Sequence, residues 1–174
     1  NKRSITVNHT KPEGQEIIRK LVETADVLIE NYKVGDLKRF GLDYESLKKI
    51  NPRLIYCSVT GFGQTGPSAA LPGYDGLFQA QGGMMAVTGI PEGQPGAGPL
   101  KAGPSLVDFI TGHNTALAIM AALMHRVRSG EGQFIDIALL DTSVAMGSHI
   151  MQDYLISGVA PPRLGNGGNG GGPA

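Results

Sequence analysis

The first 60 residues alternate between strand-like and helical patterns, and this order constrains the fold more than any other feature. A helix opened by Pro12 carries apolar residues at helical spacing up to Val22. The other expected elements are strands at residues 4–7, 26–30 and 54–59 and helices at residues 36–40 and 43–50. Because parallel strands need crossover connections, this order predicts an α/β fold with a Rossmann-like parallel sheet and flanking helices.

The second half of the sequence joins a loop-rich stretch to the longest helical pattern. Glycine and proline are frequent from Gly61 to Pro104, with one helix expected up to Gln81. After Asp108, an apolar helical pattern ends in a basic turn closed by Gly130. Its apolar face comprises Phe109, Ala116, Leu117, Met120, Leu123 and Met124. The remaining expected elements are a strand at residues 134–139 and a helix from Asp141 to about Ile156.

Charge and composition argue against several kinds of partner. The 15 basic and 15 acidic residues cancel, which gives no basis for binding nucleic acid or an anionic membrane. No uninterrupted apolar run reaches about 18 residues, so we expect no membrane-spanning segment. The single cysteine, Cys57, cannot form a disulfide within the chain, and this favours a reducing compartment, the cytoplasm. No histidines and carboxylates show convincing metal-site spacing.

Neither end of the sequence resembles a natural domain boundary. The chain begins without methionine, and glycine accumulates after Leu164. We therefore expect residues 1–164 to be a fragment of a larger domain. Residues 165–174 form a glycine-rich terminal segment, which is either a linker or an incomplete end of the chain.

Asp108 is the strongest candidate for chemistry because it stands immediately before the long helical pattern. A carboxylate there would meet unpaired amides and the positive end of the helix dipole. The preceding loop is long and rich in glycine, so backbone amides could approach a ligand beside this carboxylate. From the residues alone, the alternative interpretation of Asp108 as a simple helix cap stays open.

Several separate segments occur in an order that points to one enzyme family. The central segments are residues 103–108, 121–126 and 129–136, and the earlier ones are residues 1–5, 30–35, 39–41 and 58–67. From Asn1 to about Asn166, the chain resembles the family III CoA-transferases, of the formyl-CoA transferase and carnitine CoA-transferase type. The resemblance implies that the fold is a fragment of that family's large domain.

The resemblance also implies a reaction. The family's catalytic aspartate falls on Asp108, as the nucleophile toward acyl-CoA thioesters, through mixed anhydride and aspartyl-CoA thioester intermediates. A thiolate is a good leaving group, so a covalent route divides the exchange into easier steps. Coenzyme A is then a substrate, a small carboxylic acid is its partner, and no permanently bound cofactor is expected. Family members form interlocked homodimers, and their glycine-rich lid would lie beyond this chain.

Coenzyme A contacts are implied at five positions, though less firmly. The resemblance places them at Asn31, Tyr32, Arg39 and Phe40, with a lysine near Lys11. Arg39 and Lys11 are suitable partners for phosphate groups, and a solvated surface charge is the alternative for each. Tyr32 could stack on adenine or only cover the end of a strand.

Tyr74 and Asp75 bear on the subclass. In the α-methylacyl-CoA racemases of the same superfamily, a histidine and an aspartate act on the α-carbon of the substrate, and Tyr74 stands at the histidine position. A phenol with the ordinary pKa of about 10 is a poor base for that proton. Asp75 matches an acidic residue near the family's active site, with a helix cap as the alternative. We therefore predict CoA transfer with Asp108, Tyr74 and Asp75 in the active site; racemisation or epimerisation and a non-catalytic CoA-binding role are the alternatives.

Overall fold

The computed structural model describes residues 2–167 and contains the expected parallel sheet. Its three strands are β1 (Val27–Glu30), β2 (Ile55–Thr60) and β5 (Phe134–Ala138), in the spatial order β1-β2-β5. Both pairings are parallel, with Val27 opposite Ile55 and Tyr56 opposite Phe134. The predicted Rossmann-like α/β class is therefore confirmed. Most of the glycine-rich segment predicted at residues 165–174 lies outside the described residues.

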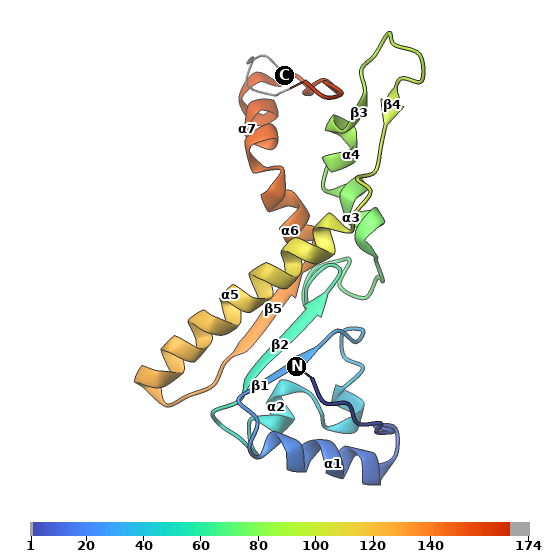
Figure 1. The fold of residues 1–174 in the computed structure, drawn as a ribbon. Coiled ribbons are helices and arrows are strands. Elements are labelled where there is room, and N and C mark those ends of the chain that lie inside the picture. Colours follow the sequence, from blue (N-terminus) through green and yellow to red (C-terminus); the bar gives the residue numbers. More distant parts are fainter. Residues whose placement is uncertain (1, 168–174) are drawn as a thin grey trace.

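The helices flank this sheet and extend beyond it (Figure 1). They are α1 (Pro12–Val22), α2 (Tyr44–Leu47), α3 (Asp75–Gln81), α4 (Met84–Val87), α5 (Leu106–Ser129), α6 (Leu139–Met146) and α7 (Ser148–Ser157), with a 3-10 turn, η1, at Lys38–Phe40. A two-residue ladder pairs β3 (Gly89–Ile90) with β4 (Gly98–Pro99) in antiparallel fashion.

The main apolar core lies between the sheet and the N-terminal helices. Its buried members are Val22, Leu42, Leu47, Leu54 and Tyr56. The hydroxyl of Tyr56 donates a hydrogen bond to the carbonyl of Leu42 at 3.1 Å, which satisfies the buried phenol. Side chains alternate along a strand, so the intervening residues of β2 point to the other face of the sheet, where α5 packs against β2 and β5.

Two arms extend from the N-terminal end of α5 (Figure 1). One arm holds α3, α4 and the β3–β4 ladder, and the other holds α6 and α7. They join where the hydroxyl of Ser143 donates to the carbonyl of Phe78 at 2.7 Å. A Cβ atom at Gly82 would collide with the Ser143 side chain, so the arms can approach this closely only with glycine there.

The structure corrects several predicted elements. Residues 4–7 form no strand, because their alternating pattern finds no partner strand among the described residues. The helix predicted from Asp141 to about Ile156 is two helices, α6 and α7, which separate at Gly147, where φ and ψ leave the helical region. The helix predicted at residues 43–50 is shortened to the single turn of α2. Helix α4 and the β3–β4 ladder lie in the glycine- and proline-rich stretch that ends at Pro104, where no element was predicted after Gln81.

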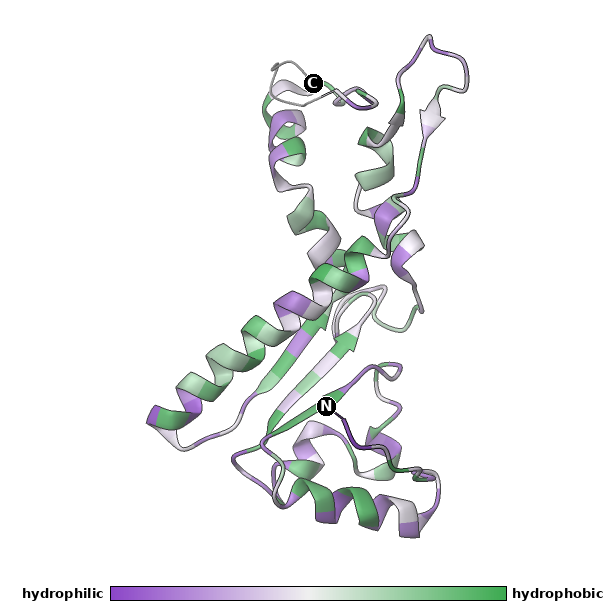
Figure 2. Ribbon diagram, viewed as in Figure 1, coloured by the Kyte–Doolittle hydropathy of each residue, from purple (hydrophilic) through white to green (hydrophobic). Residues whose placement is uncertain are grey.

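Helix α5 is oriented differently from the sequence expectation. Among the residues of its predicted apolar face, Phe109, Leu117, Met120 and Met124 are exposed. The buried residues are instead Val107, Thr111, Thr115 and Ala122. The small face packs on the sheet, because small side chains let a helix approach it closely. Figure 2 shows the apolar residues along the length of α5.

The apolar character of α5 has a second consequence. In the part of the chain that the structure describes, α5 is the one helix that is long and apolar enough to cross a membrane. Polar residues interrupt its apolar sequence, so the sequence showed no continuous apolar run there. The helix packs against β2 and β5, as core helices do. The absence of a membrane partner stays a prediction.

Candidate active site

A cleft of about 740 Å³ opens where β1 and β2 end and α5 begins. Glu30, Asn31 and Tyr32 line it at the end of β1, and Thr60 and Gly61 line it at the end of β2. From α5 it is lined by Asp108, Thr111, Gly112 and Thr115. Ligands of parallel α/β sheets gather at the carboxyl ends of the strands, so this cleft is where the fold predicts a binding site.

Asp108 lines the cleft from the first turn of α5. The sequence had suggested that Asp108 precedes the helix, but it is the third residue of α5. Burial raises the pKa of the Asp108 carboxyl above its ordinary value, and the nearby carboxylate of Asp75 raises it further. The side chain is nevertheless exposed, so a ligand in the cleft can reach it.

The amides of the first turn of α5 are already paired. The backbone N–H groups of Val107 and Asp108 both donate to one carboxylate oxygen of Asp75, at 2.8 and 3.2 Å. The next amide, that of Phe109, donates to the carbonyl of Ser105 at 3.0 Å. The expectation that Asp108 would meet unpaired amides is therefore wrong, because Asp75 occupies them. An oxyanion donor for the chemistry has to come from elsewhere.

Tyr74 and Asp75, which are adjacent in the sequence, have different environments. Tyr74 is 85% exposed and lines the cleft, whereas Asp75 is 6% exposed and lies beneath it as a cap for α5. The wall next to them is tightly packed, since a Cβ atom at Gly73 would overlap the buried ring of Phe78. The structure thus brings Tyr74 and Asp108 to one cleft, and direct contact of Tyr74 or Asp75 with a substrate stays a prediction.

Of the residues predicted to contact coenzyme A, Asn31 and Tyr32 line the cleft. The amide of Tyr32 donates to the Glu30 carboxylate at 2.7 Å, which fixes the turn after β1. The ring of His9 lies edge-on to Tyr32 and to Phe40, with centroid separations of 5.3 and 5.2 Å. His9 therefore joins two of the predicted contacts into one aromatic rim.

The two predicted cations lie outside the cleft itself. The Arg39 guanidinium stands 4.8 Å from the ring centroid of Phe40 and forms a 3.4 Å ion pair with Asp36. Lys11 is exposed at the start of α1, two residues after His9. Both positions are accessible to an anionic group at the rim, and phosphate binding by either one stays a prediction.

Sequence reasoning missed four residues of this region. Thr111, Gly112 and Thr115 lie three, four and seven positions after Asp108, so they share its helix face, and this spacing could have identified them. His9 could not be identified in this way, because no short-range pattern connects it to Tyr32. Only the fold brings that pair together.

Within the described residues, neither Cys57 nor a cluster of metal ligands forms an alternative centre. Cys57 is buried in β2, and burial raises the pKa of its thiol to about 11. A thiol with so high a pKa is a poor nucleophile at neutral pH. Within residues 2–167, no three side chains of histidine, cysteine, aspartate or glutamate are grouped so that they could hold a metal ion.

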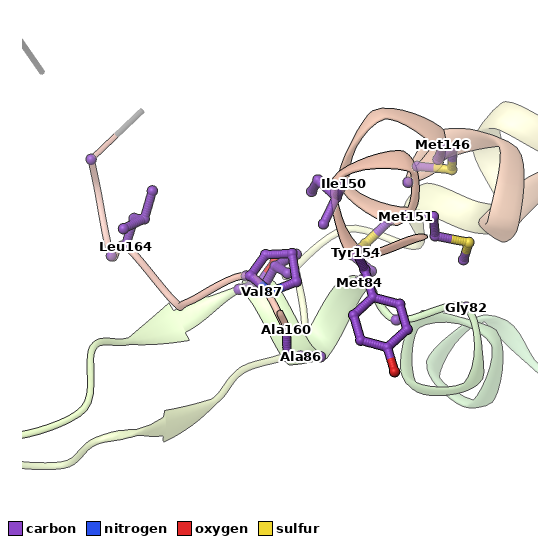
Figure 3. A pocket seen from close by; sticks show the side chains of 16 residues that line it. Gly82, Met84, Ala86, Val87, Met146, Ile150, Met151, Tyr154, Ala160 and Leu164 are labelled. Carbon is purple, nitrogen blue, oxygen red and sulfur yellow. The ribbon is translucent and has the colours of Figure 1, made fainter. Parts of the chain in front are cut away.

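A second hollow of about 590 Å³ lies between the two arms (Figure 3). Its lining is mainly apolar and includes Met84, Val87, Ile150, Met151 and Leu164. The titratable side chain among the lining residues is that of Tyr154. Acyl transfer needs a nucleophile or a charge-stabilising group, so this hollow is not the candidate site.

Comparisons with known proteins agree with the fold. The family model described as CoA-transferase family III matches residues 1–174. The chain is 54% identical over 165 residues to a succinate–glutarate CoA-transferase of Agrobacterium fabrum, covering 95% of this chain and 40% of that protein. It is 43% identical over 165 residues to the human succinyl-CoA:glutarate CoA-transferase, covering 95% of this chain and 37% of that protein.

A solved structure gives the same result. The chain superimposes on the crystal structure of a CAIB/BAIF family protein from Brucella suis with a TM-score of 0.89 and 49% identity, covering 94% of this chain and 42% of that one. The chain thus spans about two fifths of the length of these relatives. Its sequence and fold place it in CoA-transferase family III.

Proposed function

We propose that the whole protein transfers coenzyme A from an acyl-CoA thioester to a carboxylic acid, with Asp108 as the acyl carrier. The observation that carries this proposal is a reachable carboxylate in the first turn of α5, inside a cleft of about 740 Å³ at the carboxyl edge of the sheet. The names of the relatives support the same reaction type.

The proposed reaction needs only carboxylate and thiolate exchange. The ionised Asp108 attacks the donor thioester carbonyl, and coenzyme A leaves as the thiolate, which forms a mixed anhydride. The thiolate then attacks the aspartyl carbonyl and releases the donor acid, which leaves an aspartyl-CoA thioester. The acceptor carboxylate repeats these steps in reverse order and regenerates free Asp108. Each step exchanges one leaving group for one nucleophile, so no net proton or electron is needed.

Two requirements fall on the surroundings of Asp108. The anhydride must be kept from water, and each tetrahedral intermediate needs hydrogen-bond donors for its oxyanion. The first-turn amides of α5 are engaged by Asp75 and by backbone carbonyls, so they do not supply these donors. We propose that the glycine-containing wall of the cleft, at Gly61 and Gly73, or chain beyond these residues, supplies them.

The acid substrates are proposed to be small dicarboxylates. One relative is named for succinate and glutarate, and another for succinyl-CoA and glutarate. Succinate and glutarate differ by one methylene group. The cleft has a cation among its lining residues, Lys33, next to Asn31 and Tyr32. A lysine there offers a counter-charge either for the distal carboxylate of an acid or for a phosphate of coenzyme A.

The residue at position 74 disfavours the racemase alternative. Tyr74 stands at the place of the histidine, and within the described residues no hydrogen bond pairs its hydroxyl with a second group that would activate it. The non-catalytic alternative would leave Asp108 without a role, although it is the reachable carboxylate of the cleft on α5.

Assembly and location are proposed from the exposed face of α5 and from the cysteine content. The exposed apolar face of α5 would be unfavourable in water, so we propose that the rest of the protein or a second subunit of a homodimer covers it. The cytoplasm is proposed as the location because the single cysteine suits a reducing compartment.

An exchange screen on the whole protein tests this function. One labelled acyl-CoA is incubated with the protein and with succinate, glutarate and a set of hydroxy acids, and label transfer is followed by chromatography. We expect transfer to at least one dicarboxylate. Deuterium uptake at the α-carbon without an acceptor acid would favour the racemase, and tight CoA binding without any exchange would favour the non-catalytic role.

A further inference from the structure

Asp75 and Gln79 form a buried hydrogen-bonded pair next to the first turn of α5, which lines the cleft through Asp108. Both lie on α3, four residues apart, and the Gln79 amide donates to one carboxylate oxygen of Asp75 at 2.5 Å. The other oxygen of Asp75 accepts the amides of Val107 and Asp108. Both carboxylate oxygens of Asp75 therefore accept hydrogen bonds within the protein, and the side chain is 6% exposed, so it is poorly placed to contact a substrate.

Gln79 also holds the loop that leads into α5. Its side-chain carbonyl accepts the Ala102 amide at 2.9 Å, and its amide group lies 3.3 Å from the Pro104 carbonyl. Gln79 is fully buried, so these bonds are shielded from water. The loop before α5 and the first turn of α5 are thus tied to α3 at four points.

The long helix depends on this arrangement for its N-terminal cap. Ser105, the residue at the N-cap position, makes no side-chain cap within the described chain. Asp75 provides that function from another helix, because a carboxylate at a helix N-terminus pairs with free amides and with the positive end of the dipole. The same carboxylate opposes ionisation of Asp108, since like charges nearby disfavour each other.

We infer that Asp75 is a positioning residue: held by Gln79, it fixes the first turn of α5 and so sets the direction and the reactivity of Asp108. It acts on the reaction through Asp108 and touches no substrate. This inference rests on the proposed function, because it concerns the nucleophile of that reaction.

The other charged groups around the two carboxylates lie on separate elements. From the loop before α5, Lys101 approaches Gly76 and donates to the carbonyls of Ala102 and Gly103. The titratable residues that share the cleft with Asp108 are Glu30, Tyr32, Lys33 and Tyr74. They remain unchanged in an Asp75 variant, so a shift in the pH profile reports the loss of the Asp75 charge.

The test is the pH dependence of kcat/KM and of kcat for the whole enzyme and three variants. Asp75→Asn keeps the size of the side chain and removes its charge. Gln79→Leu keeps that charge and removes the bonds to Asp75 and to the loop. Asp141→Asn is the control. It makes the same substitution at an exposed carboxylate in the first turn of another helix, α6, at the third position that Asp108 holds in α5.

The sign of the expected shift follows from which form reacts. Only ionised Asp108 is a nucleophile, so activity falls as the pH decreases through its pKa. In Asp75→Asn the repulsion is gone and the pKa of Asp108 falls, so the acid limb of kcat/KM moves to lower pH. We expect kcat at neutral pH to fall roughly 10- to 100-fold, with KM for the acyl-CoA changed less than about threefold. Gln79→Leu should lower kcat about 10-fold without moving the limb, and Asp141→Asn should match wild type.

Two results would overturn the inference. An unmoved acid limb in Asp75→Asn would leave Asp75 a structural residue only, and a raised KM with kcat preserved would mean that it binds substrate. If Asp75→Asn fails to fold, Gln79→Leu decides the matter, and an unchanged kcat in that variant refutes the inference. Failure of the proposed function is a separate outcome, because an active Asp108→Ala enzyme would show it whatever the Asp75 variants do.

Discussion

The two faces of α5 differ in a way that reverses the usual pattern of a surface helix. The face toward the cleft and the sheet carries Asp108, Thr111, Gly112 and Thr115, which are small or polar. The opposite face carries Phe109, Leu117, Met120 and Met124, which are large, apolar and exposed. In a self-contained domain the large apolar face would be the buried one.

The difference leads us to expect that each face serves a separate purpose. Small residues on the inner face line the cleft beside Asp108 and let the helix lie close to the sheet. Large residues on the outer face suit packing against parts of the protein beyond these residues. Changes on the inner face should therefore alter catalysis, and changes on the outer face should alter stability.

The largest effect is expected when Asp108 is replaced. Asp108→Ala in the whole enzyme should lower kcat for CoA exchange by at least about 10³-fold, because no covalent route remains. Asp141→Ala, at the matching position of α6, should retain activity. Circular dichroism should show both variants folded, since both side chains are exposed. CoA exchange at the wild-type rate in Asp108→Ala would contradict the claim that the inner face of α5 takes part in catalysis.

Filling the inner face should obstruct substrate binding. A Cβ atom at Gly112 would meet nothing within 4 Å outside its own helix, so Gly112→Ala should be tolerated and should gain up to about 1 kcal/mol from helix propensity. Gly112→Leu adds three more carbons toward the cleft, and we expect KM for the acyl-CoA to rise about 10-fold. Steady-state kinetics compares the two variants. Equal KM values would mean that the acyl-CoA does not pass over this part of α5.

A charge on the outer face should lower the stability of the whole protein without lowering the kcat of the molecules that are folded. Met120→Lys places an ammonium group where we expect an apolar contact, and we expect a loss of about 2–3 kcal/mol in the free energy of unfolding. Denaturant titration measures that loss, and kcat per folded molecule should stay unchanged. Met120→Leu is the conservative control. A Lys variant as stable as wild type would show that the outer face faces solvent in the whole protein.

The smallest effect is expected at Thr111. Among the described residues, its buried hydroxyl oxygen has no hydrogen-bond partner. Thr111→Val keeps the shape of the side chain and removes the unsatisfied group, so we expect a gain of about 1 kcal/mol in stability. Thermal unfolding of the whole protein without substrate measures it. A loss of stability would show that chain beyond these residues bonds to this hydroxyl.

The sequence was sufficient to predict the sheet and the place of Asp108 at the start of the long helix, but not the orientation of α5. The β1-β2 order and the position of Asp108 follow from local patterns and from motifs that remain contiguous. The buried face of α5 could not be predicted, because hydrophobic periodicity identifies an apolar face without showing what covers it. The cap that Asp75 provides could not be predicted either, because Val107 and Asp108 lie 32 and 33 positions after Asp75 in the sequence.

The central claim is that Asp108 carries the acyl group, and a trapping experiment tests it most directly. The whole enzyme is incubated with acyl-CoA and hydroxylamine, digested with a protease and analysed by mass spectrometry. The account predicts a hydroxamate on the peptide that contains Asp108, formed only when acyl-CoA is present, and none in Asp108→Ala. An unmodified Asp108 in an enzyme that exchanges coenzyme A under the same conditions would contradict it.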